Sequence, residues 1–294
     1  MSIFSRFTDS LKEKGERMGA EMSFFQHLEA LRWHVIRAAL AVLVFTIIAF
    51  IFYDKIFYGI ILAPTRTDFW TYRMMCNMGT VFHNLFSLDP EGFCVKSINF
   101  QLINTELAGQ FNLQFSSSIM IGLILGIPYL LYEIWRFIKP ALHEKERKAA
   151  SGFVFYCSFL FMLGVLFGYY VVTPLSVRFF VTYTVSDTIK NMFSIDSFIS
   201  AETMLTLVAG IVFQLPIVVY ILSSLDILTP KFMREKRRYA TIIILVLAAV
   251  ITPSPDALTM LVVALPLFIL YEFSIFVSAL VQRRKAKEEG LMKL

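Results

Sequence analysis

This sequence is short of charged residues and of the side-chain groupings that enzymes and metal sites need. Only 17% of its 294 residues are charged, while 57% are hydrophobic; a soluble domain has roughly 25% charged residues. The four histidines are scattered, and no two have metal-ligand spacing. HExxH, GxSxG and phosphate-loop motifs are absent. We therefore predict that the protein is not an enzyme and has neither a metal nor a cofactor.

The hydrophobic residues form long runs, which is typical of a membrane protein. About 20 apolar residues are needed to cross a hydrocarbon core ~30 Å thick. Six candidate segments can be placed at 35–53, 116–138, 151–172, 204–225, 239–251 and 257–281. We predict an all-α polytopic membrane protein with six transmembrane helices, the last two of them short. Pro128, Pro216 and Pro266 are expected to kink the second, fourth and sixth helices.

Lysine and arginine are distributed unevenly between the connections. The N-terminal segment through Arg37, the loops 136–148 and 231–238, and the tail after Gln282 hold 21 of the 27. Because positively charged loops favour the cytoplasmic side, both termini are predicted to be cytoplasmic. The net charge of +5 is then explained by topology, and no nucleic-acid site is expected.

The same distribution predicts three regions. Residues 1–22 are expected to be a mobile cytoplasmic arm without a cleavable signal peptide, because they contain no short apolar core. Residues 23–281 form the membrane domain, with a long outside connection at about 54–115, and residues 282–294 form a basic cytoplasmic tail. Cys76 and Cys94 both lie in the outside connection, where an oxidising compartment permits a disulfide, although spacing alone does not establish the pairing.

A few polar residues in or beside the predicted spans need partners. Gln214 lies mid-span, where it either joins two helices by a hydrogen bond or lines a polar cavity. Glu133, near the end of the second span, is expected to pair with Arg136 three residues later. Asp256, before the sixth span, is expected to cap that helix.

A secondary transporter or channel for a small solute is the alternative function, which Gln214 and the prolines permit. No charged residue falls mid-span in the predicted segments, and no internal repeat is visible, so both observations argue against a transporter of this kind. A membrane enzyme ranks third, because the sequence offers no candidate catalytic group.

Several motifs, in order along the chain, resemble those of one family. They are HLEALRWH (27–34), Ala63-Pro64, PYLLYEIWRFIKPALHEKERK (128–148), YYVVTPL (169–175), FQLP (213–216) and TPSPD (252–256). The chain is similar over about 24–281 to TatC, the polytopic subunit of the twin-arginine protein translocase.

The resemblance implies a subunit of the bacterial inner membrane that binds signal peptides with paired arginines. With single-span TatA-like and TatB-like partners, in an oligomeric complex, such a subunit moves folded proteins across the bilayer by using the proton-motive force. The resemblance places recognition of the arginine pair at Glu146, with Arg147 and Phe137 beside it, and the family's N-terminal arginine at Arg32. It assigns structural or transport-related positions to Pro64, Phe111, Pro128, Gln214 and Asp256.

The sequence departs from the family pattern at three positions. The family's N-terminal glutamate falls at Ala30, so Glu29 would be the substitute, about 100° around the helix. A family arginine falls at His34. The mid-span glutamate of the family falls at Gln214, which keeps hydrogen bonding but does not titrate.

Overall fold

A computed structural model describes residues 24–86, 101–139, 152–186, 191–252 and 257–291. The predictions for Glu146, Arg147, Cys94 and Asp256, and for the arm 1–22, lie outside these residues.

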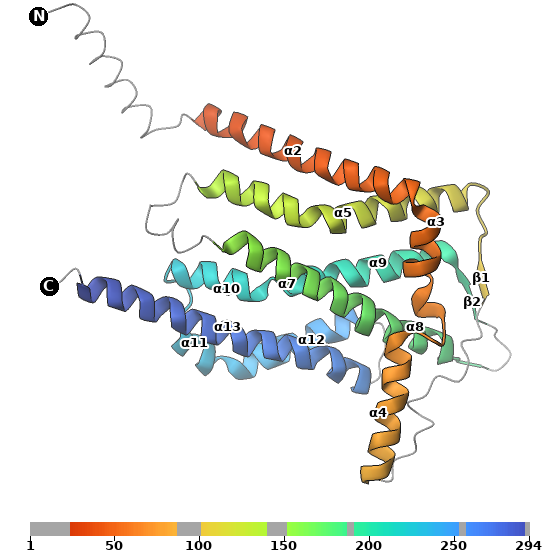
Figure 1. Ribbon diagram of the computed structural model, residues 1–294. Helices are drawn as coiled ribbons and strands as arrows, with labels where there is room; N and C mark the ends of the chain where they lie inside the picture. Colours follow the sequence, from red (N-terminus) through yellow and green to blue (C-terminus); the bar gives the residue numbers. More distant parts are fainter. Residues whose placement is uncertain (1–23, 87–100, 140–151, 187–190, 253–256, 292–294) are drawn as a thin grey trace, which may run out of the picture.

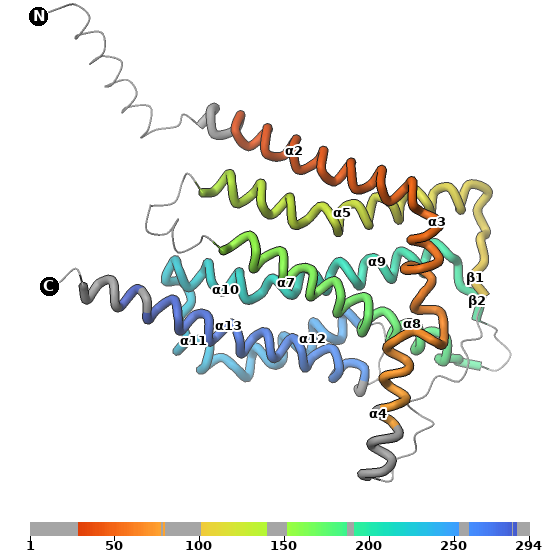
Figure 2. Tube along the Cα trace, viewed as in Figure 1, coloured from red at the N-terminus to blue at the C-terminus, as the bar shows by residue number. Residues whose placement is uncertain are grey.

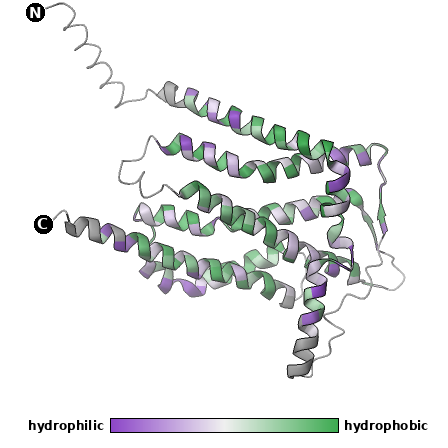
Figure 3. Cartoon of the chain, in the orientation of Figure 1, coloured by the Kyte–Doolittle hydropathy of each residue, from purple (hydrophilic) through white to green (hydrophobic). Residues whose placement is uncertain are grey.

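The long helices lie side by side in a roughly parallel bundle (Figure 1). Along the chain they are α2 (Phe24–Ile51), α5 (Gly109–Ile138), α7 (Phe153–Phe167), α9 (Ile195–Val212), α10 (Leu215–Ser224), α12 (Arg237–Ile251) and α13 (Ala257–Leu291). Apolar residues cover the bodies of these helices, and hydrophilic residues gather near their ends (Figure 3). Large apolar side chains such as Val44, Phe155 and Val246 are more than half exposed, as expected for a surface that faces lipid.

Five helical segments of the described chain are long and apolar enough to cross a membrane. They are Glu29–Ile51, Gly109–Ile138, Phe153–Thr182, Ile195–Ser224 and Thr259–Arg283. The chain is therefore an all-α polytopic membrane protein, as predicted. Helix α12 has 15 residues, about 22 Å at ~1.5 Å per residue, so a sixth crossing stays a prediction.

The prediction that the last two spans are short is right for α12 and wrong for α13. Helix α13 has 35 residues, and its candidate span covers 25 of them. Glu272 lies inside this candidate span, and its carboxylate accepts a hydrogen bond from Arg237 Nη2 at 2.7 Å. The helix also continues to Leu291, so most of the predicted tail 282–294 is an extension of α13.

The two ends of the bundle differ in structure. The start of α2 and the ends of α5 and α13 lie at one end, here called the terminal end (Figure 2). The short elements α3 (Tyr53–Ile56), η1 (Phe57–Ile61) and η2 (Ala63–Thr65) lie at the opposite end, together with the 17-residue helix α4 (Trp70–Phe86). There β1 (Gln101–Ile103) pairs in parallel with β2 (Met192–Ser194), with Leu102 opposite Phe193. The predicted outside connection is thus largely structured.

The remaining elements complete the chain between these helices. A π-helix, η5 (Gly168–Val172), and α8 (Thr173–Thr182) extend α7, and α11 (Pro230–Glu235) precedes α12. At Pro216, where a kink is predicted, the helix is interrupted: α9 ends at Val212 and α10 begins at Leu215. Pro128 and Pro266 lie inside α5 and α13, and the kinks at these two prolines stay predictions.

Helices α2 and α5 approach closely through two glycines one turn apart. A Cβ atom at Gly122 would lie 2.6 Å from the Thr46 backbone nitrogen, and one at Gly126 would lie 2.7 Å from Val42 Cγ2. Small residues at this spacing allow helices in membranes to pack closely. This contact holds the first two spans together and brings their polar residues at the terminal end within reach of each other.

Candidate functional site

The Glu133 side chain is the centre of a polar cluster between α2 and α5 at the terminal end. It is 2% exposed. His34 Nδ1 lies 2.5 Å from Glu133 Oε2, and Arg37 Nε donates to the same oxygen at 3.3 Å. The Tyr129 hydroxyl donates to Oε1 at 2.9 Å. The carboxylate is therefore fully engaged by protein groups, as a buried charge requires.

Helix periodicity explains how these four residues meet. His34 and Arg37 are three residues apart on α2, and Tyr129 and Glu133 are four apart on α5, so each pair shares a helix face. The predicted pairing of Glu133 with Arg136 is wrong. Arg136 is exposed, whereas Glu133 is turned towards α2, where two nitrogen donors reach it.

Of the predicted signal-peptide residues, Phe137 contacts this cluster, and Glu29 and Arg32 precede it on α2. The Phe137 ring packs edge-on against the His34 ring, with centroids 5.8 Å apart. Glu29 and Arg32 are exposed on α2, and Glu29 Oε1 lies 3.8 Å from Arg32 Nη1. An exposed ion pair of this kind contributes at most about 1 kcal/mol to stability. Both side chains can therefore leave each other and pair with charged groups of another molecule. The predictions for Glu146 and Arg147 are not tested by the described residues.

The structure places Phe111 and Pro64 away from this cluster, whereas Pro128 directly precedes Tyr129 in α5. Phe111 is in the first turn of α5, at the opposite end, and is 63% exposed. Pro64 is buried in η2, and its carbonyl accepts a hydrogen bond from the Tyr72 hydroxyl at 2.9 Å. The same hydroxyl lies 3.1 Å from the Pro174 carbonyl. Tyr72, which the sequence did not single out, thus links two proline-containing turns, and burial raises its pKa well above the ordinary value.

Gln214 joins two helical segments. Gln214 lies in the break between α9 and α10. Its Nε2 atom donates a hydrogen bond to the Cys157 carbonyl of α7 at 3.1 Å. This contact favours the first of the two interpretations, a hydrogen bond between helices. A role in transport stays a prediction.

The cysteines are in two states. Cys76 of α4 is disulfide-bonded, whereas Cys157 is free and buried. Because Cys94 lies outside the described residues, the Cys76–Cys94 pairing stays a prediction.

A charged residue in the fourth candidate span was missed. The predicted span began at Met204, but α9 begins at Ile195 and the candidate span covers Ile195–Ser224. Glu202 lies inside it and is 5% exposed. The expectation that no charged residue falls mid-span is therefore wrong. A search that extended the apolar segment through one acidic residue would have included it.

Comparison with known proteins identifies the family. Residues 26–266 match the family described as Sec-independent protein translocase protein (TatC). The chain belongs to the TatC family. It is thus a component of a Sec-independent protein translocase, a transport protein of the membrane. Membership separates it from transporters of small solutes, the alternative considered above.

Individual TatC proteins support this over most of the chain. The TatC protein of a Blattabacterium from Periplaneta americana is 38% identical, covering 90% of this chain and 98% of that protein. The TatC protein of Carboxydothermus hydrogenoformans is 31% identical, covering 91% and 97%. A crystal structure described as the twin arginine translocase receptor TatC, in DDM, is 30% identical. It matches with a TM-score of 0.60, over 86% of this chain and 99% of that one.

Proposed function

We propose that this TatC protein binds the paired-arginine signal peptides of folded precursors at the terminal end of the bundle. With single-span TatA-like and TatB-like partners, in an oligomeric complex, it moves those precursors across the bacterial inner membrane by using the proton-motive force. The terminal end faces the cytoplasm in this proposal.

The arrangement of charges at the terminal end carries the proposal. Glu133 is engaged by His34, Arg37 and Tyr129, so its charge is not available to an arginine of a signal peptide. The cluster instead holds the polar start of α2 against the end of α5. The resemblance to the family assigns recognition of the signal peptide to Glu146, eight residues after the end of α5 in the sequence, and Glu29 on the exposed surface of α2 is proposed as a second anion.

Two further observations support the orientation. Most lysine and arginine residues lie in segments that connect at the terminal end, which favours the cytoplasmic side. Cys76 is disulfide-bonded in α4 at the opposite end, which suits an oxidising compartment there.

Site-specific photocrosslinking tests the proposal. A photoreactive residue is placed beside the arginine pair of a precursor's signal peptide, and crosslinking to the full-length protein is measured in membranes. Glu146→Ala should abolish crosslinking, because a bidentate arginine contact is lost. Glu144→Ala, in the same loop, is the matched control and should retain it.

Undiminished crosslinking in Glu146→Ala would reject Glu146 as the recognition residue. Glu29→Gln should reduce crosslinking by a smaller factor, because Glu29 is more solvated. If Glu29→Gln has no effect, that stretch of α2 is an interfacial anchor only.

A further inference from the structure

Glu202 is a buried acid with an unsatisfied oxygen inside a candidate membrane span. It lies in the third turn of α9, and its side chain is almost completely buried. Within the described chain, its Oε2 atom has no hydrogen-bond partner, and the same is true of Thr206 Oγ1, one turn later, and of Thr173 Oγ1 in α8. Buried polar groups are nearly always paired, so unpaired polar atoms in this one region mark it as a candidate polar binding site.

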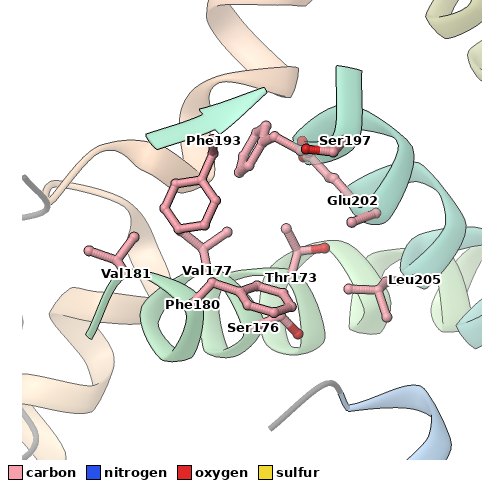
Figure 4. Close-up of a pocket in the computed structure, with 11 residues that line it drawn as sticks. Thr173, Ser176, Val177, Phe180, Val181, Phe193, Ser197, Glu202 and Leu205 are labelled. Carbon is pink, nitrogen blue, oxygen red and sulfur yellow. The ribbon is translucent and has the colours of Figure 1, made fainter. Parts of the chain in front are cut away.

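A cavity of about 280 Å³ between α8, α9 and β2 has both Glu202 and Thr173 in its lining. Figure 4 shows Glu202, Thr173 and Ser176 among the side chains that line it, with Phe180 and Phe193 in its mostly apolar wall. The volume is sufficient for several water molecules, each of which occupies about 30 Å³ in the liquid.

The cavity extends from the interior towards the opposite end of the bundle. Its lining includes the buried residues Glu202 and Thr173 and also Ser197, which is exposed in the first turn of α9, and Phe193 of β2. β2 and the start of α9 lie at the end that carries α4 (Figure 1). A small group can therefore reach Glu202 from that side.

The titratable neighbours leave the Glu202 charge uncompensated. Tyr72 of α4 and Tyr169 of η5 interact electrostatically with Glu202. Both are neutral phenols, so neither provides a positive charge to balance the carboxylate. Arg178 of α8 acts on Tyr72, and Asp196 of α9 acts on Tyr53. An ionised carboxylate without a cation partner costs far more in such surroundings than a protonated, neutral carboxyl does.

We propose that Glu202 is a proton-binding site that is loaded through this cavity from the compartment at the α4 end, and that its proton is used in the transport cycle. The use of this proton in transport rests on the proposed function. It would assign the dependence of transport on the proton-motive force to the carboxyl group of Glu202. Proton binding itself is measured on the protein alone, so the two proposals can fail separately.

A hydrophobic carbodiimide tests the proposal chemically. The protonated carboxyl adds its O–H across one C=N bond of dicyclohexylcarbodiimide, giving an O-acylisourea with the proton on nitrogen. Migration of the acyl group from oxygen to nitrogen then gives a stable N-acylurea, and nothing is released. The full-length protein in sealed vesicles of known orientation is treated, digested and examined by mass spectrometry.

We expect N-acylurea on Glu202, with a yield that falls when the pH is raised on the α4 side and does not respond to the other side. Glu202→Gln should remove the modification. Glu133, which three donors engage, and Glu272, which pairs with Arg237, are internal controls that should react poorly. No reaction at Glu202 under mildly acidic conditions, or a yield that follows the pH of the other compartment, would overturn the proposal.

Transport of a folded precursor provides the second measurement. Glu202→Gln should slow transport several-fold and leave signal-peptide crosslinking intact. Full transport in a variant that retains crosslinking would exclude Glu202 from the transport cycle. If the variant loses crosslinking, and so has lost its fold, the side dependence of carbodiimide labelling in the unaltered protein decides the question.

Discussion

His34 Nδ1 of α2 lies 2.5 Å from Glu133 Oε2 of α5, although the two residues are 99 positions apart. This contact joins the first two candidate spans at the terminal end of the bundle. The two acids at this end therefore differ in role. Glu133 joins α5 to α2 through His34 and Arg37, whereas Glu29 is exposed and pairs only with Arg32 among the ion pairs of the described residues.

Removing the Glu133 carboxylate is expected to reduce stability and leave signal recognition intact. Glu133→Ala leaves Arg37 and His34 without their acceptor, and should lower the free energy of unfolding by roughly 1–3 kcal/mol. Glu272→Ala, which breaks a more exposed pair, should cost less than about 1 kcal/mol. Thermal unfolding in detergent and the crosslinking assay measure the two effects. Lost crosslinking at unchanged stability would show that Glu133 contacts the signal peptide directly.

The close approach of α2 and α5 should not tolerate a methyl group at Gly122. Gly122→Ala places a Cβ atom against the Thr46 backbone, and such overpacking typically costs roughly 1–3 kcal/mol. Gly59→Ala is the control, because a Cβ there meets no atom within 4 Å. The comparison is made by thermal unfolding in one detergent. Equal stability of the two variants would contradict the observed packing.

The buried Tyr72 hydroxyl predicts a loss of stability at alkaline pH. Burial raises the pKa of Tyr72 in the folded protein, so the unfolded chain releases this proton first as the pH rises. The stabilisation is complete below the ordinary tyrosine pKa of about 10 and declines above it. Tyr72→Phe removes the hydrogen bonds to the Pro64 and Pro174 carbonyls, so it should be less stable at neutral pH by roughly 1 kcal/mol. Because it also removes the titrating group, its stability should decline less steeply at alkaline pH. Unfolding measured across alkaline pH checks the slope, and an unchanged slope would be evidence against a buried phenol.

Gln214 is expected to act through its hydrogen bond to α7. Gln214→Leu keeps the volume and removes the donor to the Cys157 carbonyl, which should cost roughly 0.6–1.7 kcal/mol. Transport should fall only as far as the loss of folded protein explains. A variant that is fully stable and inactive would favour the cavity interpretation instead.

The disulfide of Cys76 is predicted to be with Cys94. Because the chain has three cysteines and Cys157 is free, the denatured, unreduced protein should have one thiol that reacts with a maleimide. Cys76→Ser should raise that number to two by releasing Cys94. Mass spectrometry counts the labels, and an unchanged number would show that Cys76 pairs elsewhere.

Much of the fold could be predicted because hydropathy is a local property. Apolar runs near 20 residues must form helices in lipid, where each backbone group needs an internal partner, and those runs are visible without the structure. The same logic failed at the edges. The apolar run predicts a fourth span that begins at Met204 and so leaves out Glu202, and Glu272 makes the apolar part of the last span look short.

The sequence by itself determined the class of protein and the approximate spans; the assignment of Glu29, Arg32 and Phe137 to signal-peptide binding is implied by the family resemblance and stays a prediction. Only the tertiary structure decided that Glu133 pairs with His34 and Arg37 rather than with Arg136. It also decided that Gln214 bonds to α7 and that Glu202 borders a cavity. The physical reason is that pairing depends on which helix faces meet, and those faces are set by close packing between residues distant in sequence, such as Gly122 and Thr46.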